Sequence, residues 1–338
     1  MILIFSSDAK EKDVENAVKK IESLGFHPHL SRGAIRTIVG ITGDDRAIPE
    51  EEFNQLPGVE QILHVLKPYK LASRDFHPDD TLIKVNEERI GRGNFTVIAG
   101  PCSIESTEQV ETIAAYLETF NLKFIRGGAF KPRSSPYSFQ GLGEKGLKIL
   151  RDSADRHGLA VVTEVLSAHE VELVGNYTDI FQVGARNMQN FALLKALGKA
   201  QKPILLKRSM MGKIEELLLS AEYIMKEGNE RIILCERGIR TFETATRNTL
   251  DIGAVPVIKR FSHLPVIIDP SHSMGDWHYI KSASMAAIAS GADGLIVEIH
   301  PDPLHAKSDG KQSLKLDNFK ELFEQLVKIS KVLKVKVC

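Results

Sequence analysis

Side chains of the kinds that bind metal ions occur at four scattered positions: Cys102, His272, Glu298 and Asp309. A thiolate, an imidazole and two carboxylates form a mixed sulfur, nitrogen and oxygen set, which suits a divalent ion such as zinc, manganese or iron. No short spacing motif joins them, so this hypothesis needs a fold that brings the four together. On the pattern alone, a buried cysteine, a surface histidine and two ordinary acids remain the simpler alternative.

Cationic side chains recur where apolar runs end, at Arg126, Lys131, Arg186, Lys207 and Arg237. Taken singly, each is expected to be a solvated surface residue. If one fold gathers them at a single opening, they predict a site for several phosphate and carboxylate groups, because arginine and lysine bind such anions through charge-assisted hydrogen bonds.

A third feature is the run from Lys131 to Pro136, which reads Lys-Pro-Arg-Ser-Ser-Pro. Two cations and two hydroxyls in a loop stiffened by proline are suited to holding a phosphate. An exposed basic turn is the alternative interpretation.

Bulk properties exclude several classes of protein. The chain has 338 residues, with 44 Lys+Arg balancing 44 Asp+Glu, so charge does not indicate a nucleic-acid or membrane partner. The cysteines, at positions 102, 235 and 338, are too few for a disulfide framework and fit a reducing compartment. Charged residues directly follow the apolar start, Met1–Phe5, which argues against a signal peptide, and no stretch is long and apolar enough to span a membrane. We therefore expect a cytoplasmic protein.

Eight short apolar runs, each followed by a stretch with helical character, must position these side chains. The runs are Phe95–Ala99, Lys123–Arg126, Ala160–Glu164, Ile180–Val183, Pro203–Lys207, Arg231–Cys235, Pro265–Asp269 and Gly294–Ile299. Eight β/α units predict an α/β fold of the TIM (β/α)8 barrel type over residues 81–338, with Leu82–Ile90 as a hairpin at its bottom. The functional side chains would then meet at the carboxyl ends of the strands. An open, doubly wound sheet is the structural alternative.

Residues 1–66 have a different pattern. Strand-like and helix-like segments follow one another in the order β-α-β-β-α-β, which predicts a small ferredoxin-like domain. Residues 67–80 contain two prolines and much charge, and we interpret them as a linker.

Six motifs, in this order along the predicted barrel, resemble those of the 3-deoxy-D-arabino-heptulosonate 7-phosphate (DAHP) synthase family. They are Ala99-Gly100-Pro101-Cys102-Ser103, Arg126-Gly127-Gly128-Ala129-Phe130-Lys131-Pro132-Arg133-Ser134, Gly184-Ala185-Arg186-Asn187-Met188-Gln189, Lys207-Arg208, Cys235-Glu236-Arg237-Gly238 and Asp269-Pro270-Ser271-His272. Many members have threonine where this chain has Ser134, which keeps the hydroxyl. The N-terminal unit resembles the ferredoxin-like domain of a subset of the family.

The resemblance implies a condensation of phosphoenolpyruvate with erythrose 4-phosphate that needs one divalent ion of the Mn, Zn, Fe, Co or Cd class. It implies Cys102, His272, Glu298 and Asp309 as metal ligands, and Lys131 and Glu164 as catalytic residues. Phosphoenolpyruvate would bind to Arg126, Lys131, Ala185, Arg186, Lys207 and Arg237. Erythrose 4-phosphate would bind to Pro132, Arg133, Ser134 and Ser135.

Two other functions remain open. The 3-deoxy-D-manno-octulosonate 8-phosphate synthases use the same donor with arabinose 5-phosphate, but they typically have Lys-Ala-Asn-Arg-Ser where this chain has Lys131-Pro132-Arg133-Ser134-Ser135. A barrel that binds metabolites without chemistry is the second alternative, and a complete set of metal ligands argues against it.

By family analogy we expect residues 1–66 to be regulatory, with phenylalanine or tyrosine as effector, and the protein to be a homotetramer. His29, Ser31 and Arg32, expected at a turn between the two central strands, are candidate effector contacts. Alternatively, the unit only builds an interface between subunits.

Overall fold

The computed structural model describes residues 1–33, 36–42, 51–63, 68–132, 135 and 137–338. These residues form two compact units, one of residues 1–79 with 261–263 and one of residues 80–260 with 264–338. Among the helices of these residues, none combines the length and the apolar character that crossing a membrane requires.

The first unit is a four-stranded antiparallel sheet with helices. Along the chain it contains β1 (Ile2–Phe5), α1 (Glu11–Ser23), β2 (His27–Arg32), β3 (Thr37–Thr42), α2 (Glu51–Asn54) and β4 (Val59–Leu63). The strands lie in the order β2-β3-β1-β4. Helix α1 buries Val14, Ala17 and Ile21 in one core with residues of β1 and β3. The predicted ferredoxin-like β-α-β-β-α-β order is confirmed.

The expected turn for the effector contacts is wrong. His29, Ser31 and Arg32 all lie within β2, which is at the edge of the sheet rather than at its centre. Because successive side chains of a strand point to opposite faces, Arg32 points away from the face shared by His29 and Ser31. Arg32 pairs with Glu11 of α1, whereas the ring of His29 lies 4.8 Å from that of Phe76.

The segment predicted as a linker is packed where the structure describes it. Tyr69, Ala72 and Phe76 are buried. A Cβ on Gly40 of β3 would lie 1.5 Å from the Phe76 ring, so only glycine at this position lets the ring pack directly on the sheet. Residues 68–79 therefore belong to the first unit.

The second unit is a closed parallel barrel. Its strands are β7 (Asn94–Gly100), β8 (Phe124–Arg126), β9 (Ala160–Glu164), β10 (Ile180–Val183), β11 (Ile204–Lys207), β12 (Ile232–Glu236), β13 (Val266–Ile268) and β14 (Gly294–Glu298). Each pairs with the next, and β14 pairs with β7 in the register Gly294↔Thr96 to Glu298↔Gly100. That last pairing closes the sheet and rules out the open, doubly wound alternative.

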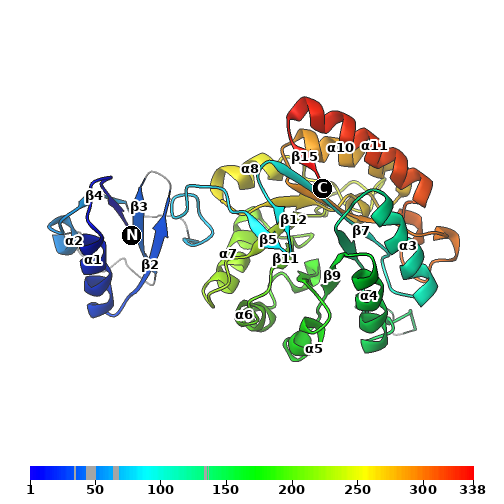
Figure 1. Cartoon of the computed structure of the whole chain (residues 1–338), viewed down its shortest axis with the longest axis horizontal. Coiled ribbons are helices and arrows are strands. Elements are labelled where there is room, and N and C mark those ends of the chain that lie inside the picture. The colour runs from blue at the N-terminus through cyan, green and yellow to red at the C-terminus, as the bar shows by residue number, and fades with distance from the viewer. Residues whose placement is uncertain (34–35, 43–50, 64–67, 133–134, 136) are drawn as a thin grey trace. The chain divides into compact units, whose positions relative to one another are not determined.

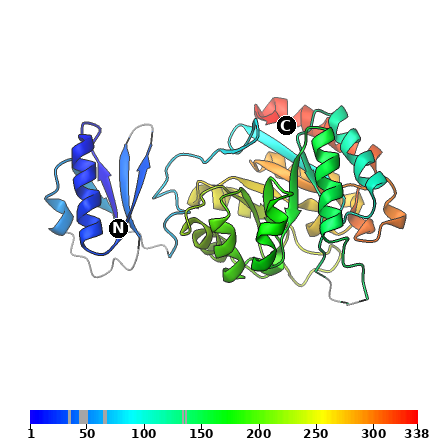
Figure 2. The same ribbon diagram turned by 60° about the horizontal axis from the view of Figure 1, so that its bottom comes forward.

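Helices surround the strands on the outside of the barrel (Figures 1 and 2). The longer ones are α3 (Thr107–Thr119), α4 (Glu144–Arg156), α6 (Phe191–Lys199), α7 (Ile214–Met225), α8 (Ala254–Phe261), α10 (Trp277–Ala289) and α11 (Leu316–Leu333). They cover strands that are buried along nearly their whole length, as expected where both faces of a parallel sheet are packed.

The amino ends of the strands are closed by short elements. The antiparallel hairpin of β5 (Ile83–Val85) and β6 (Glu88–Ile90) places Ile83, Val85 and Ile90 in the core cluster that fills the barrel. Strand β15 (Lys336–Val337) pairs with the start of β7. With this end filled, the carboxyl ends of the strands are left for a site.

Candidate active site

The carboxyl ends of the barrel strands surround a cavity of about 450 Å³. Its lining is mostly polar and cationic, and comprises Arg126, Lys131, Pro132, Ser135, Ser138, Glu164, Gln182, Gly184, Ala185, Arg186, Lys207, Met210, Arg237, Arg240, Arg247, Asn248, His272 and Asp309. Members of each group of predicted barrel site residues therefore meet at one opening, as the barrel hypothesis required.

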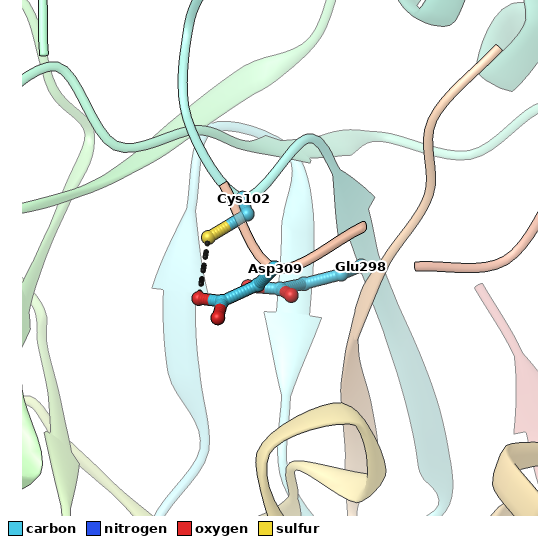
Figure 3. A group of neighbouring side chains, drawn as sticks. All are labelled: Cys102, Glu298 and Asp309. Atoms are coloured by element: carbon cyan, nitrogen blue, oxygen red, sulfur yellow. Dashed lines mark hydrogen bonds between the residues drawn. The ribbon is translucent and has the colours of Figure 1, made fainter. Parts of the chain in front are cut away.

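Three of the four predicted metal ligands form a tight group. One ligand atom each from Cys102, Glu298 and Asp309 lie within 4.8 Å of one another. Figure 3 shows the cysteine sulfur facing the Asp309 carboxylate, with Glu298 beside it; the sulfur lies 3.2 Å from Oδ2 of Asp309. The fourth, His272, is outside this group, but its Nε2 is 3.5 Å from Oε1 of Glu298. The donor types and this proximity fit a divalent ion.

Local backbone features bring these residues together. A Cβ on Gly100, the last residue of β7, would lie 1.9 Å from the carbonyl oxygen of Arg126, so glycine allows the chain leading to Cys102 to pass close to β8. Asp309 has a left-handed backbone, with φ of 50°, a conformation that Asp adopts more readily than most residues. Asp269 accepts a hydrogen bond from the backbone N–H of His272 and so caps α9 (Pro270–Met274).

Charge and burial act in opposite directions on these ligands. Burial by itself would raise the pKa of Glu298, but His272 in its protonated form, Arg126 and Lys131 outweigh burial and hold that pKa at about 2. For Cys102 burial prevails, and with the Glu298 carboxylate it raises the thiol pKa to about 12. The thiolate form therefore needs more positive charge than the nearby Lys131 and Arg126 supply.

The ring of His272 lies between two carboxylates. Its Nδ1 lies 2.7 Å from Oδ2 of Asp269, which leaves Nε2 on the side of Glu298. Burial lowers the pKa of His272 more than the nearby carboxylates raise it, so the neutral imidazole, the form that binds metals, is favoured. A carboxylate behind a histidine is a common support in metal sites.

The predicted donor-binding cations differ in exposure. Arg126, Lys131, Lys207 and Arg237 are buried, whereas Arg186 is exposed on the short helix η3 (Ala185–Asn187). Lys207 lies 2.5 Å from Asp269, and Arg126 lies 2.6 Å from Glu298. Buried cations at a cavity wall are costly without negative partners. The carboxylates of Asp269 and Glu298 supply part of that negative charge, and an anionic ligand in the cavity would supply more.

Arg208, also at the end of β11, has a different place. Its guanidinium contacts Glu236 at 2.9 Å and Asp251 at 2.7 Å, and it does not line the cavity. Arg208 thus joins the ends of β11 and β12 and supports the chain at Arg237.

Glu164 ends β9 and faces the cavity beside Gly184. A Cβ on Gly184 would lie 2.0 Å from Oε1 of Glu164. The missing side chain of Gly184 therefore makes the room that this carboxylate occupies.

The predicted acceptor loop is described only in part. Pro132 and Ser135 line the cavity, whereas Arg133 and Ser134 lie outside the described residues.

Comparison with known proteins matches both units. Residues 79–335 match the model of the DAHP synthetase I family, and residues 1–67 match that of the DAHP synthase ferredoxin-like domain. The chain belongs to the DAHP synthase family.

Individual members of the DAHP synthase family agree with this. A phospho-2-dehydro-3-deoxyheptonate aldolase of Thermotoga maritima is 54% identical over 337 residues, covering 100% of both chains. A crystal structure of a DAHP synthase from the same organism covers 100% of this chain and 99% of its own, with a TM-score of 0.81. A 2-dehydro-3-deoxyphosphooctonate aldolase of Syntrophobacter fumaroxidans is 31% identical over 73% of this chain and 91% of its own. The heptonate enzyme is thus nearer in identity and in coverage than the octonate enzyme.

Several residues that line the cavity were not predicted from the sequence, namely Ser138, Gln182, Met210, Arg240, Arg247 and Asn248. Gln182 lies inside an apolar strand, and a polar residue within such a run was the available signal. Arg240, Arg247 and Asn248 lie in the long loop after β12, where no periodicity marks which side chains turn inward.

Proposed function

We propose that this protein condenses phosphoenolpyruvate with D-erythrose 4-phosphate to give DAHP and inorganic phosphate, the first step of the shikimate pathway. The observation that carries the proposal is the full-length 54% identity to a heptonate aldolase, on a chain whose barrel opening is lined with cations. Carbon 3 of phosphoenolpyruvate bonds to the aldehyde carbon of the acceptor. Water adds at carbon 2, and the bond from carbon 2 to the phosphate oxygen breaks.

The donor is held by cations. Phosphoenolpyruvate has about three negative charges, and Arg126, Lys131, Arg186, Lys207 and Arg237 supply positive charge and N–H donors for its phosphate and carboxylate. The backbone N–H of Ala185 adds a donor for the phosphate. Four of the five cations are buried, which strengthens their attraction for the donor.

Cys102, His272, Glu298 and Asp309 would hold one divalent ion, of the Mn, Zn, Fe, Co or Cd class. Such an ion supplies Lewis acidity to the aldehyde oxygen as negative charge develops there. The thiolate of Cys102 favours the softer ions of this class, and the carboxylates favour the harder ones.

Proton movements are assigned to Lys131 and Glu164. The amine of Lys131 lies at the metal ligands, 3.3 Å from the Cys102 sulfur, where it can give a proton to the developing alkoxide. Glu164, on another strand, orients the water. Pro132, Arg133, Ser134 and Ser135 hold the phosphate of the acceptor, away from the ion.

We further propose that the protein is a cytoplasmic homotetramer, inhibited by phenylalanine or tyrosine through its ferredoxin-like domain. The family match to residues 1–67 supports a role for this domain outside catalysis. Every residue that we assign to the reaction lies within residues 79–335, outside this domain.

The test is release of inorganic phosphate from mixtures of phosphoenolpyruvate and a sugar phosphate. We expect release with erythrose 4-phosphate and its loss after treatment with a chelator. Preferred turnover of arabinose 5-phosphate would replace the proposal with the octulosonate synthase. No release with either sugar would favour a non-catalytic binding barrel.

A further inference from the structure

Behind the metal ligands lies a buried amide that the reaction does not use. Gln312 ends the short helix η5 (Gly310–Gln312) and is 2% exposed. Its Nε2 donates to Oε2 of Glu298 at 2.7 Å, and its Oε1 accepts from the Arg247 guanidinium at 2.7 Å. The partners fix the orientation of the amide, because reversing it would set its NH2 against a guanidinium and its oxygen against a carboxylate.

The Glu298 carboxylate is thus held from two sides. Oε1 accepts from Arg126 at 2.6 Å, while Oε2 accepts from Gln312. Removing one of two such donors leaves a buried carboxylate oxygen without its hydrogen bond, and the carboxylate is then fixed from one side only. Of the two donors, Arg126 is also assigned to substrate, so Gln312 is the one whose contact with Glu298 is not shared with a ligand.

Arg247 extends the contact to a second ligand. Its guanidinium nitrogen lies 2.7 Å from Gln312 and 3.5 Å from Oδ1 of Asp309. Glu298 is the last residue of β14 and Asp309 lies in the segment that follows it. The contacts Glu298–Gln312–Arg247–Asp309 join the two through side chains.

We propose that Gln312, oriented by Arg247, is a positioning residue that arranges Glu298 and Asp309 for the divalent ion before the ion binds. The inference rests on the proposed metal site and deepens it. Residues that hold metal ligands in this way typically contribute 10- to 100-fold in affinity. We expect a loss of about that size when the amide is removed.

The experiment measures metal affinity directly, with no substrate present. Wild-type protein and Gln312→Met, which keeps the length of the side chain but loses both hydrogen bonds, are freed of metal and titrated with Mn²⁺ and Cd²⁺ against a competing chelator. Ultraviolet absorption of the cadmium–thiolate bond reports whether Cys102 is bound. Lys311→Ala is the matched control, since Lys311 is the exposed neighbour in the same helix.

The expected result is a 10- to 100-fold weaker affinity in Gln312→Met, a smaller loss in Arg247→Met and wild-type affinity in Lys311→Ala. Affinity within twofold of wild type in Gln312→Met would overturn the inference. Equal losses in Gln312→Met and Lys311→Ala would overturn it as well, because they indicate general loosening of the turn. Should Gln312→Met not fold, Gln312→Asn takes its place, with the same expected loss and the same overturning results.

Failure of the proposed function has a different signature. A wild-type protein that binds no divalent ion contradicts the proposed metal site itself. A wild-type protein that binds the ion but releases no phosphate from the two substrates contradicts the proposed reaction and leaves the role of Gln312 standing.

Discussion

The side-chain nitrogen of Lys131 lies 3.1 Å from the carbonyl oxygen of Cys102 and 3.3 Å from its sulfur. One cation thereby contacts a proposed metal ligand and lines the proposed donor site. The proposed sites for the ion and for phosphoenolpyruvate are therefore adjacent.

Removal of the ion should abolish activity, and Cys102→Ser should change which ions restore it. The substitution removes the soft sulfur ligand and leaves nitrogen and oxygen ligands. We expect affinity for Cd²⁺ and Zn²⁺ to fall about tenfold or more relative to that for Mn²⁺. Chelator competition on the purified variant measures the three affinities. Full activity in a wild-type preparation shown by elemental analysis to be free of metal would contradict the prediction.

Gly184→Ala should displace the Glu164 carboxylate. The new methyl group would overlap Oε1 of Glu164, which is the far end of a flexible side chain, so the protein should still fold. We expect kcat to fall about 10- to 100-fold, as when a reacting group is misplaced, with little change in KM for phosphoenolpyruvate. Steady-state kinetics beside Glu164→Gln tests this, and an unchanged kcat in Gly184→Ala would show that this carboxylate position is unimportant.

Substitutions in the acceptor loop should affect binding of erythrose 4-phosphate more than binding of phosphoenolpyruvate. Replacing Pro132 by Ala together with Arg133→Asn removes a charge-assisted contact to the acceptor phosphate. Losing this contact should cost about 2 kcal/mol of binding free energy, which corresponds to a roughly 30-fold higher KM for erythrose 4-phosphate. The KM for phosphoenolpyruvate should change little. Arg186→Ala is the matched control and should show the opposite preference. Equal effects of the loop variant on both substrates would refute our division of the cations.

Deletion of residues 1–79, which include the packed segment 68–79, should separate catalysis from regulation. The truncated protein is expected to keep its activity and to lose inhibition by phenylalanine and tyrosine, because an effector acts only by binding two states of the protein unequally. Titration of both proteins with each amino acid is the measurement. Undiminished inhibition would place the effector site on the barrel. Loss of the oligomer, with no inhibition even of the full-length protein, would indicate a purely structural role.

A surface network should make stability depend on pH. His157 contacts Glu118 at 2.7 Å and Glu111 at 2.9 Å, and these hydrogen bonds, Glu118 first, raise its pKa above 6.5. A histidine whose pKa is higher in the folded than in the unfolded state stabilises the fold below its unfolded pKa. That contribution is lost as the pH rises through its folded pKa.

The pKa of Glu111 is lowered to about 2, chiefly by Arg156 and then by His157. The ionised carboxylate therefore stabilises the fold above about pH 4.5, and this stabilisation is lost as the pH falls toward 2. Melting temperatures of wild type and His157→Gln should therefore differ most between about pH 4.5 and 6.5, and should converge at alkaline pH. A difference that is constant from pH 5 to 9 would contradict this, and Glu118→Gln should remove much of the pH dependence.

The barrel was predictable because its strands are buried on both faces and read as apolar runs. The expected run Ala160–Glu164 coincides with β9, and Ile180–Val183 coincides with β10. Helix α6 was not predicted individually, because its nine residues are few for assigning a helix from an apolar pattern. The expected turn at Ser31 and Arg32 was wrong because polar residues there continue an edge strand rather than end it.

The site was predictable only in part. The strand-end cations and the predicted metal ligands were singled out by residue type and by resemblance, and the fold brings the cations to one cavity and three of the four predicted ligands to one group. Gln312 and Arg247 carry no such signal, since polar residues in long loops are usually solvated. Their roles emerge from contacts between segments far apart in the chain, which no local pattern encodes.

The closing pair of strands has a consequence for the order of events during synthesis. Cys102 follows β7, and its contact with Asp309 spans 207 positions of the chain. Because the pairing of β7 with β14 brings the two segments together, a growing chain on the ribosome would lack the complete proposed metal centre until almost all of it has emerged. Contacts between such distant segments also form slowly. Loading of the proposed ion would therefore be a late event after synthesis, and it would report that the barrel has closed.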